Sequence, residues 1–360
     1  MTVKTLSKIG KTLEFFFDTV IIRSKEQGGD DMGLRGLRYF LVAAEEMNFR
    51  RAAEKLYITQ QTLSVHIQKL ERQYGVPLFE RKPKLMLTPA GQALVEYARK
   101  ALRMEDLFRS QLTDIADTST GRINVGITGI RGTIFMPRIW EVFHAQFPNI
   151  TMTLTEASTP RLDELLQQGR LDLYIGVDAP VRSSTEVWAL SLEKACCVAS
   201  QPFLNEHLAD GGRALAAKAR SEGLDLSDLR GLPLVAFSRG NSLRDTLEGY
   251  YQNEGERPHI VLETSRHDLV LRFCQQGSGV GLLYQMILYD MLRTMRDDPA
   301  LRIFPMKTFL SPKYTNLVYR RETYKPRYMT GFIQTAQDVF RDYAENVDSL
   351  IKKAIVTAGA

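Results

Sequence analysis

The amino-acid sequence predicts a mixed fold. We expect an N-terminal domain of short helices with a two-stranded wing, a long linker helix, and an α/β domain made of two Rossmann-like subdomains. Three observations predict this: short amphipathic helices over residues 34–74, a proline-initiated helical pattern over residues 89–118, and alternating strand and helix patterns from residue 122 onwards. At 360 residues the chain is long enough for separate cores.

The positive charge of the chain is concentrated in the short-helix region. The formal net charge is +5, and residues 33–90 alone contain ten Lys and Arg against five Asp and Glu. The rest of the chain is therefore balanced. A local excess of this kind is typical of a domain that binds a polyanion.

Cysteine usage and hydropathy favour a cytoplasmic protein. The three cysteines, Cys196, Cys197 and Cys274, do not form a disulfide framework. No apolar run reaches the roughly 18 residues of a membrane span, and the N-terminal segment FFFDTVII is a poor signal peptide. Residues 1–31 leave two interpretations open: a docking helix, or sequence upstream of a start at Met32.

Residues 34–74 have the spacing of a helix-turn-helix. Leu37 and Phe40 belong to a first amphipathic helix, Asn48 caps a short second helix, FRRAAEKL, and Thr59 caps a third, QQTLSVHIQKLE. Small alanines in the second helix allow close packing. Helix, turn and helix in this order are the arrangement that reads DNA.

The third helix has one apolar stripe and one unusual polar stripe. The apolar stripe contains Leu63, Ile67, Leu70 and Tyr74, and the opposite stripe contains Gln61, Ser64, Val65, Gln68 and Arg72. A face that meets only solvent usually carries Glu and Lys. Short uncharged hydrogen-bonding groups around an exposed valine are instead suited to base edges.

A wing follows this helix. In GVPLFERKPKLMLTPAG the apolar pieces PLF and LML flank a basic tip, residues 81–84. The pattern predicts a β-hairpin that lies along a phosphate backbone.

A long helix begins with Thr88 as its cap and Pro89 in its first turn. Apolar residues recur along it in a heptad pattern, which predicts pairing with a second copy of the chain; a lone helix lying on a domain could look similar. The predicted dimer seam consists of Leu94, Tyr97, Ala101, Met104, Phe108 and Ile115.

From residue 122 the patterns alternate as βαβαβ, with a predicted helix over residues 135–147, and a second set begins at ACCVAS (195–200). We expect subdomain I over residues 122–194 and 311–345, subdomain II over residues 195–310, and a C-terminal tail at 346–360. An alanine-rich helical insert lies within the second set.

Several chemistries are not expected. The five histidines lack metal-ligand spacing with Cys or carboxylates. No GxSxG, paired acids or Cys/His arrangement predicts an enzyme. The segment GITGIRG (126–132) lacks the spacing of nucleotide-binding loops, although amides at the start of a helix can bind a small anion.

The stretch from Leu34 to about Leu112 closely resembles the N-terminal domain of LysR-type transcriptional regulators. A weaker resemblance extends through the α/β domain, at residues 137–139, 162–173 and 275–284, and excludes residues 1–31 and the insert near 209–223. It implies a winged helix-turn-helix, an effector domain like periplasmic binding proteins, and a sequence-specific DNA-binding regulator that responds to a small molecule. The implied partners are double-stranded DNA, further copies of the chain in a dimer and a tetramer, the effector, and RNA polymerase.

Together with the helix pattern, the resemblance assigns DNA contacts to Gln60, Gln61, Ser64, Val65, Gln68, Arg81, Lys82 and Lys84. The chain departs from the family in two places. Thr59-Gln60-Gln61 replaces the usual Ser-Gln-Pro, and Val65 replaces a long polar or basic residue. This indicates a different operator preference.

The resemblance also implies an effector site between the two subdomains, and ligands of open α/β folds bind beyond the carboxyl ends of strands. The predicted effector-binding residues are Thr128, Gly129, Ile130, Arg131, Ser158, Thr159, Ser238, Arg239 and Asn241. Helix-start amides, hydroxyl groups and Arg131 favour a small anion as co-inducer. We expect no other cofactor and no metal.

Three alternatives remain open at this point. The side chain of Arg131 could point to solvent. The response could be a redox reaction of Cys196 or Cys197, although a buried strand pair is the commoner outcome. A solute-binding protein would explain the α/β halves, but it needs an export signal and has no use for a wing.

Overall fold

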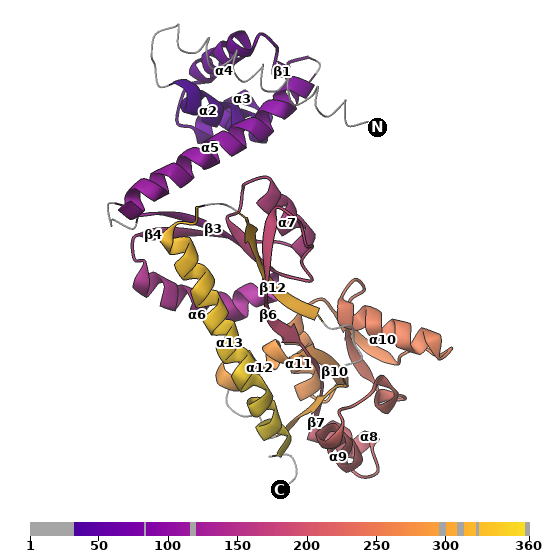
Figure 1. The fold of residues 1–360 in the computed structure, drawn as a ribbon. Helices are drawn as coiled ribbons and strands as arrows, with labels where there is room; N and C mark the ends of the chain where they lie inside the picture. The colour runs from indigo at the N-terminus through magenta and orange to yellow at the C-terminus, as the bar shows by residue number, and fades with distance from the viewer. Residues whose placement is uncertain are drawn as a thin grey trace, which may run out of the picture. The chain divides into compact units, whose positions relative to one another are not determined.

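The computed structural model describes residues 32–82, 84–115, 120–294, 300–307, 313–321 and 324–356 (Figure 1). The chain divides into two compact units, Met1–Asp106 and Leu107–Ala360. Both interpretations of residues 1–31 lie outside the described residues. Within the described ranges, no helix is long and apolar enough to span a membrane.

The first unit contains the predicted helix-turn-helix and wing. Its elements are α2 (Met32–Glu46), α3 (Phe49–Lys55), α4 (Gln60–Tyr74), β1 (Phe79–Glu80), β2 (Met86–Leu87) and the first part of α5 (Pro89–Ile115). Asn48 caps α3 by accepting from the amides of Arg50 and Arg51, and Thr59 caps α4 by accepting from Thr62. β1 and β2 pair antiparallel, with Phe79 opposite Leu87.

The core of this unit forms where the apolar stripes of the helices meet. Phe40 from α2, Ala52 from α3, and Leu63 and Ile67 from α4 are fully buried. The small side chain of Ala52 permits the close approach of α3 that the sequence predicts.

The start of α5 packs tightly against the wing. The Thr88 hydroxyl donates to the carbonyl of Pro77 at 2.7 Å and accepts from the amide of Gly91 at 2.9 Å. A Cβ atom at Gly91 would lie 2.1 Å from the carbonyl oxygen of Leu78, so only glycine fits there. From Pro89 the helix continues without interruption to Ile115.

Subdomain I is a mixed five-stranded sheet with the order β4-β3-β5-β12-β6. Its elements are β3 (Gly121–Ile127), α6 (Gly129–Gln146), β4 (Ile150–Glu156), α7 (Thr159–Gln167), β5 (Leu173–Val177), β6 (Thr185–Glu193) and β12 (Lys313–Arg320). β3 runs parallel to β4 and β5, and β12 runs antiparallel to β5 and β6.

Subdomain II is a second five-stranded sheet with the order β11-β7-β10-β8-β9. Its elements are β7 (Ala195–Ser200), α8 (Gln201–His207), α9 (Arg213–Ser221), the 3-10 helix η1 (Leu226–Leu229), β8 (Leu234–Phe237), α10 (Ser242–Asn253), β9 (Ile260–Thr264), α11 (His267–Gln275), β10 (Val280–Tyr284), α12 (Gln285–Thr294) and β11 (Leu301–Pro305). The chain enters this sheet after β6 and returns to subdomain I at β12. The α/β halves are therefore arranged as predicted.

Two helix boundaries differ from the sequence prediction. α6 begins at Gly129 rather than at residue 135, so Pro137 lies in the interior of the helix and not in its first turn. The C-terminal helix α13 (Arg327–Val356) continues into the predicted tail at 346–360, as far as Val356, and residues 357–360 lie outside the described residues. Val347 and Ile351 are buried, and this continued apolar stripe explains why the helix does not end at residue 345.

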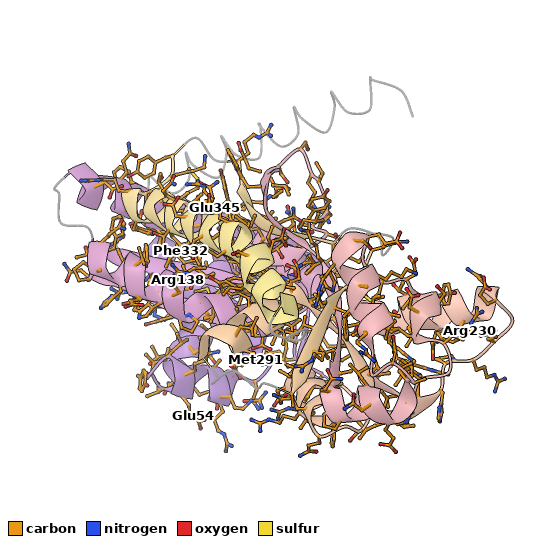
Figure 2. The ribbon with its side chains drawn as sticks, turned by 90° about the horizontal axis from the view of Figure 1, so that it is seen from below. Glu54, Arg138, Arg230, Met291, Phe332 and Glu345 are labelled. Atoms are coloured by element: carbon orange, nitrogen blue, oxygen red, sulfur yellow. The ribbon has the colours of Figure 1, made fainter. Side chains whose placement is uncertain are left out.

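α13 connects the two subdomains. It packs against α6 and β6 of subdomain I and against α12 and β11 of subdomain II. Its own Phe332 is fully buried, and Arg138 of α6 forms an ion pair with Asp342 of α13 at 2.6 Å (Figure 2). Lys194, between β6 and β7, pairs with Asp348 at 2.8 Å.

Candidate DNA-binding and effector-binding sites

Helix α4 presents the predicted polar face to solvent. Its opposite side is fixed in the core by Leu63, Ile67 and Leu70. Val65 is 44% exposed and lies in the middle of the polar face. On this face Gln60, Gln61, Val65 and Gln68 are exposed and Ser64 is partly exposed.

The wing is anchored to α4 by a residue that the sequence reasoning missed. The Glu71 carboxylate accepts from the amide of Leu78 at 2.9 Å and from that of Phe79 at 3.4 Å. Its other oxygen lies 3.6 Å from the guanidinium of Arg81. This carboxylate therefore holds the start of the wing against α4.

The basic residues of the wing tip are not equivalent. Arg81 lies over the ring of Phe49, 5.7 Å from its centroid, and faces Glu71, so that part of its charge is engaged within the domain. Lys82 and Lys84 are exposed. Pro83 lies outside the described residues.

Tyr57 is an exposed aromatic residue beside α4 that the sequence did not single out. It lies in the turn between α3 and α4, is 96% exposed and has a positive φ of 55°. Non-glycine residues rarely adopt this conformation. No sequence pattern distinguishes such a tyrosine from an ordinary loop residue.

Much of the predicted dimer seam is exposed on α5. Tyr97 is 43% exposed, Met104 67% and Phe108 55%, and Ala101 is partly buried. Leu94 differs because it is buried in the core of the first unit, so the exposed apolar stripe begins at Tyr97. The side chain of Ile115 lies outside the described part of the structure.

Arg131 is the centre of a buried polar cluster in the second unit. It is 5% exposed, and its guanidinium lies 3.3 Å from the Glu193 carboxylate at the end of β6. It also donates to the hydroxyl of Thr315 at 2.9 Å and to that of Thr128 at 3.4 Å. The Thr315 hydroxyl in turn donates to Glu193. The alternative in which Arg131 points to solvent is therefore wrong.

The charges of this cluster influence two titratable side chains of subdomain II. Burial, followed by the nearby charge of Arg131, lowers the pKa of His267 at the start of α11. Burial raises the pKa of Tyr284 at the end of β10, and the tyrosine shares a hydrogen bond with Ser242. Glu193, Thr315, His267 and Tyr284 had no local sequence signal because the fold assembles them from separate strands and helices.

The remaining predicted effector residues lie at strand ends and helix starts. Thr128, Ser158 and Asn241 occupy the N-cap positions of α6, α7 and α10, and the Asn241 side chain accepts from the amide of Leu243 at 2.9 Å. The buried Thr159 hydroxyl accepts from the amide of Val177 at 2.9 Å. Gly129 and Ile130 form the first turn of α6.

Two predicted residues of subdomain II differ in exposure. Ser238, which directly follows β8, is partly buried, whereas Arg239 is 81% exposed at its side chain and lies 3.6 Å from Glu248. The structure therefore brings Thr128 and Arg131 together and gives Arg239 a surface position.

The cysteines are poor candidates for redox sensing. Cys196, Cys197 and Cys274 are all buried. Burial raises the pKa of both Cys196 and Cys274 to about 12, and raises that of Cys197 well above its usual value. Thiols held protonated in this way are weak nucleophiles. In the part of the chain that the structure describes, no group of three His, Cys, Asp or Glu residues could hold a metal ion.

Comparison with known proteins decides the family. Residues 34–92 match the bacterial regulatory helix-turn-helix proteins of the lysR family, and residues 116–341 match the LysR substrate binding domain. This chain belongs to the LysR family of DNA-binding transcriptional regulators. The family resemblance read from the sequence is confirmed.

Similar proteins include hydrogen peroxide-inducible activators and other transcriptional regulators. The hydrogen peroxide-inducible genes activator of Pectobacterium carotovorum is 31% identical over 258 residues, which are 70% of this chain and 80% of that protein. The transcriptional regulator OxyR of Escherichia coli K12 is also 31% identical, over 70% of this chain and 79% of its own length. A probable RuBisCO transcriptional regulator of Synechocystis is 25% identical over 87% of this chain and 88% of that protein.

Solved LysR-type structures have the same fold. Full-length OxyR from Pseudomonas aeruginosa matches 87% of this chain and 96% of its own, with a TM-score of 0.59 and 23% identity. CbnR complexed with its target DNA matches 85% of this chain and 99% of its own, with a TM-score of 0.53 and 21% identity.

Proposed function

We propose that this LysR-type regulator reads a specific DNA sequence with the exposed face of α4 and steadies the complex through Lys82 and Lys84 of the wing. The observation that supports this proposal is the contrast between the two sides of α4. Leu63, Ile67 and Leu70 fix the helix in its domain, and the other side offers glutamine, serine and valine. These groups match base edges and a thymine methyl in the major groove.

We further propose that a small polar effector acts at the Arg131 cluster. This cluster combines hydroxyl groups, a guanidinium and a carboxylate, all from subdomain I, and its charges influence the pKa values of His267 and Tyr284 of subdomain II. An anionic effector would compete with Glu193 for Arg131. Among the described residues Oε2 of Glu193 has no hydrogen-bond partner, so a donor group on the effector could bind this oxygen.

The exposed stripe on α5 supports assembly into a dimer, with a tetramer formed through the effector domains. A dimer places two reading helices on one DNA, which requires paired half-sites. RNA polymerase would be the further partner. The protein would act in the cytoplasm, where its DNA is, and without an enzymatic reaction of its own.

Selection from a random-sequence DNA library with the full chain tests the DNA proposal. We expect enrichment of one motif with two half-sites related by symmetry. The Gln61→Ala variant should enrich a different or relaxed motif, because Gln61 lies on the base-reading face. Enrichment of the same motif by the variant would remove Gln61 from base reading.

The effector proposal is tested by induction of a reporter placed behind the selected motif. We expect Thr128→Val and Thr159→Val to weaken induction while DNA binding persists. The Cys196→Ser/Cys197→Ser variant should respond normally, because burial keeps these thiols protonated. Loss of the response in the cysteine variant alone would overturn the effector site in favour of redox sensing.

A further inference from the structure

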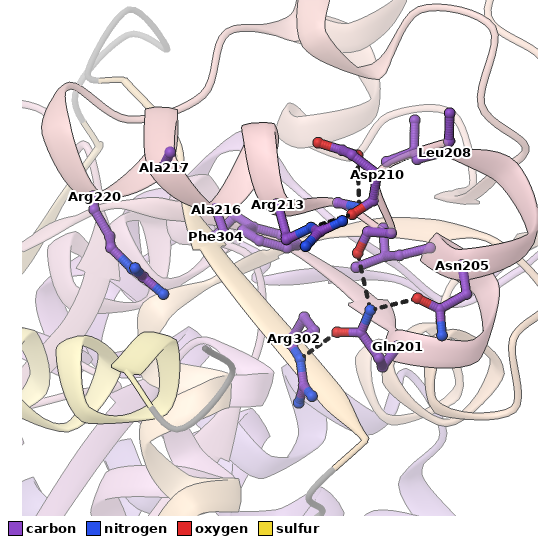
Figure 3. A pocket seen from close by; sticks show the side chains of 14 residues that line it. Gln201, Asn205, Leu208, Asp210, Arg213, Ala216, Ala217, Arg220, Arg302 and Phe304 are labelled. Atoms are coloured by element: carbon purple, nitrogen blue, oxygen red, sulfur yellow. Dashed lines mark hydrogen bonds between the residues drawn. The ribbon is translucent and has the colours of Figure 1, made fainter. Parts of the chain in front are cut away.

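The polar groups beside α9 and β11 bind one another. They line a cavity of about 770 Å³ in subdomain II (Figure 3). Arg302 donates to the side chain of Gln201 at 2.7 Å and to the carbonyl of Leu301 at 3.2 Å. Arg213 donates to the carbonyl of Asp210 at 3.0 Å. These arginines therefore serve the structure of subdomain II.

The turn between α3 and α4 carries a side chain without such partners. Tyr57 is 96% exposed, the highest exposed fraction among the large hydrophobic side chains that the structure describes. Its hydroxyl forms no hydrogen bond with any described residue. Aromatic rings usually stabilise a protein by packing, and tyrosine hydroxyls by hydrogen bonding. Neither part of the Tyr57 side chain does so within the first unit.

The backbone at Tyr57 has a conformation that favours glycine. The amide of Tyr57 donates to the carbonyl of Glu54 at 3.1 Å, within the last turn of α3. The next amide, that of Ile58, donates to the carbonyl of Ala53 at 3.0 Å. The two bonds form a Schellman motif, in which the residue at the position of Tyr57 has a positive φ and is most often glycine.

The first unit uses glycine where it ends α4. Gly75 has a φ of 71° there, in the same left-handed region as the φ of 55° at Tyr57. A side chain at positive φ carries a steric cost that glycine avoids. At Tyr57 this cost comes together with an exposed ring, and no contact of the described residues offsets either. Local strain of this kind is typical of functional positions.

Tyr57 also lies beside the end of α4 that carries the base-reading residues. It stands two residues before Thr59, the cap of α4, and Gln60 and Gln61 follow in the exposed first turn. Ile58 packs against the core, which holds this turn in place. In helix-turn-helix complexes the N-terminal residues of the reading helix contact base edges. The turn before that helix then lies next to the phosphates that border the groove.

We propose that the Tyr57 hydroxyl donates a hydrogen bond to a DNA phosphate at the edge of each half-site and so positions α4 in the groove. Tyrosine hydroxyls are among the groups that bind phosphates in protein–DNA complexes. The inference rests on the proposed function, because it takes α4 as the reading helix. The hydroxyl is neutral, so this contact adds nothing to counterion release. It also carries no base specificity, because every nucleotide presents the same phosphate.

Fluorescence anisotropy with the full chain tests the proposal, on DNA that carries the selected motif and on random DNA, over a range of salt concentrations. Tyr57→Phe should weaken binding to both DNAs about tenfold per contact, the loss for a hydrogen bond to a charged group. The slope of log K against log salt and the preferred motif should not change. Lys84→Gln is the matched comparison, because loss of a charged contact should reduce this slope by about one.

The Tyr57→Gly variant separates DNA binding from folding. It should weaken DNA binding at least as much as Tyr57→Phe does. In chemical denaturation it should raise the denaturant concentration at which the first unit unfolds, because glycine adopts a positive φ without steric cost. A lower denaturant concentration would show that Tyr57 stabilises the turn, and this result would overturn the proposal.

Two binding results would also overturn it. Unchanged affinity of the Tyr57→Phe variant would exclude the bond between hydroxyl and phosphate. A changed motif in that variant would place the hydroxyl at a base edge instead. Failure of the proposed function has a different result, since Gln61→Ala would then enrich the same motif as the unchanged chain. If Gln61→Ala changes the motif and Tyr57→Phe has no effect, α4 reads DNA and only the inference about Tyr57 fails.

Discussion

Arg131 and Glu193 form an ion pair with a separation of 3.3 Å inside the effector domain, where their side chains are 6% and 0% exposed. The arginine lies in the first turn of α6 and the glutamate ends β6. The pair therefore joins the segment after the first strand of subdomain I to the segment that leads into subdomain II. An effector that binds at Arg131 would act directly on this connection.

The first prediction concerns the stability of this pair. Glu193→Ala leaves a buried guanidinium without its counter-ion, which typically costs about 3–5 kcal/mol. We expect a loss of this size in chemical denaturation of the effector domain transition. Glu164→Ala, which removes the exposed partner of Arg161, should cost less than about 1 kcal/mol. Equal losses of unfolding free energy for the two substitutions would show that the buried pair stabilises the domain no more than the exposed pair does.

The second prediction concerns Val65. We expect a thymine at the corresponding step of each half-site, because the thymine methyl is the apolar feature of the major groove. Val65→Ala removes apolar contact worth on the order of 1 kcal/mol, so the preference for thymine over cytosine should fall about fivefold. Binding to half-sites with each base, measured by fluorescence anisotropy, checks this. An unchanged preference would exclude the methyl contact.

The third prediction separates phosphate contacts from base contacts. Lys84→Gln should weaken binding to specific and random DNA alike and reduce the slope of log K against log salt by about one. Arg81→Gln should have a smaller effect on this slope, because Arg81 already faces Glu71 and Phe49. Salt titrations of the two variants provide the measurement. A larger effect at Arg81 would mean that its guanidinium turns toward DNA on binding.

The fourth prediction concerns the exposed stripe on α5. Phe108→Lys would bury a charge in the predicted helix pair, and we expect dissociation of the dimer in sedimentation velocity together with loss of high-affinity DNA binding. Gln92→Lys on the same helix is the matched control, because it adds the same charge at an exposed position on the side of α5 away from the seam. A Phe108→Lys protein that remains dimeric and binds DNA normally would show that the helix pairs elsewhere.

Much of the first unit could be predicted from sequence because its signals are local. Asn48 and Thr59 cap helices two to three residues from the groups that they serve, and the apolar stripe of α4 is continuous. The wing followed from two apolar pieces around a basic tip. The contacts of Glu71 with the wing could not be predicted, because a glutamate on a helix surface has no distinctive sequence pattern.

The effector domain was less predictable because its polar groups come from distant segments. Arg131 could be predicted as a site residue because it follows a strand. Its partners Glu193 and Thr315 are brought to it by the pairing of β6 with β12, which no local sequence pattern reveals. The start of α6 was predicted too late, at residue 135, because glycines such as Gly129 and Gly132 are uncommon inside helices and obscure its first turn.

The register of β6 and β12 has a consequence for how this domain can be taken apart. Glu193 and Lys313 are direct partners in an antiparallel pair, so the last residue of one strand faces the first residue of the other. Residues 194–312 thus form an insertion whose two ends meet, and a two-residue hairpin turn could close the gap. A chimaera carrying another regulator's second lobe would therefore be spliced at these two points, and the new lobe would have to match the face of α13 that packs against α12 and β11.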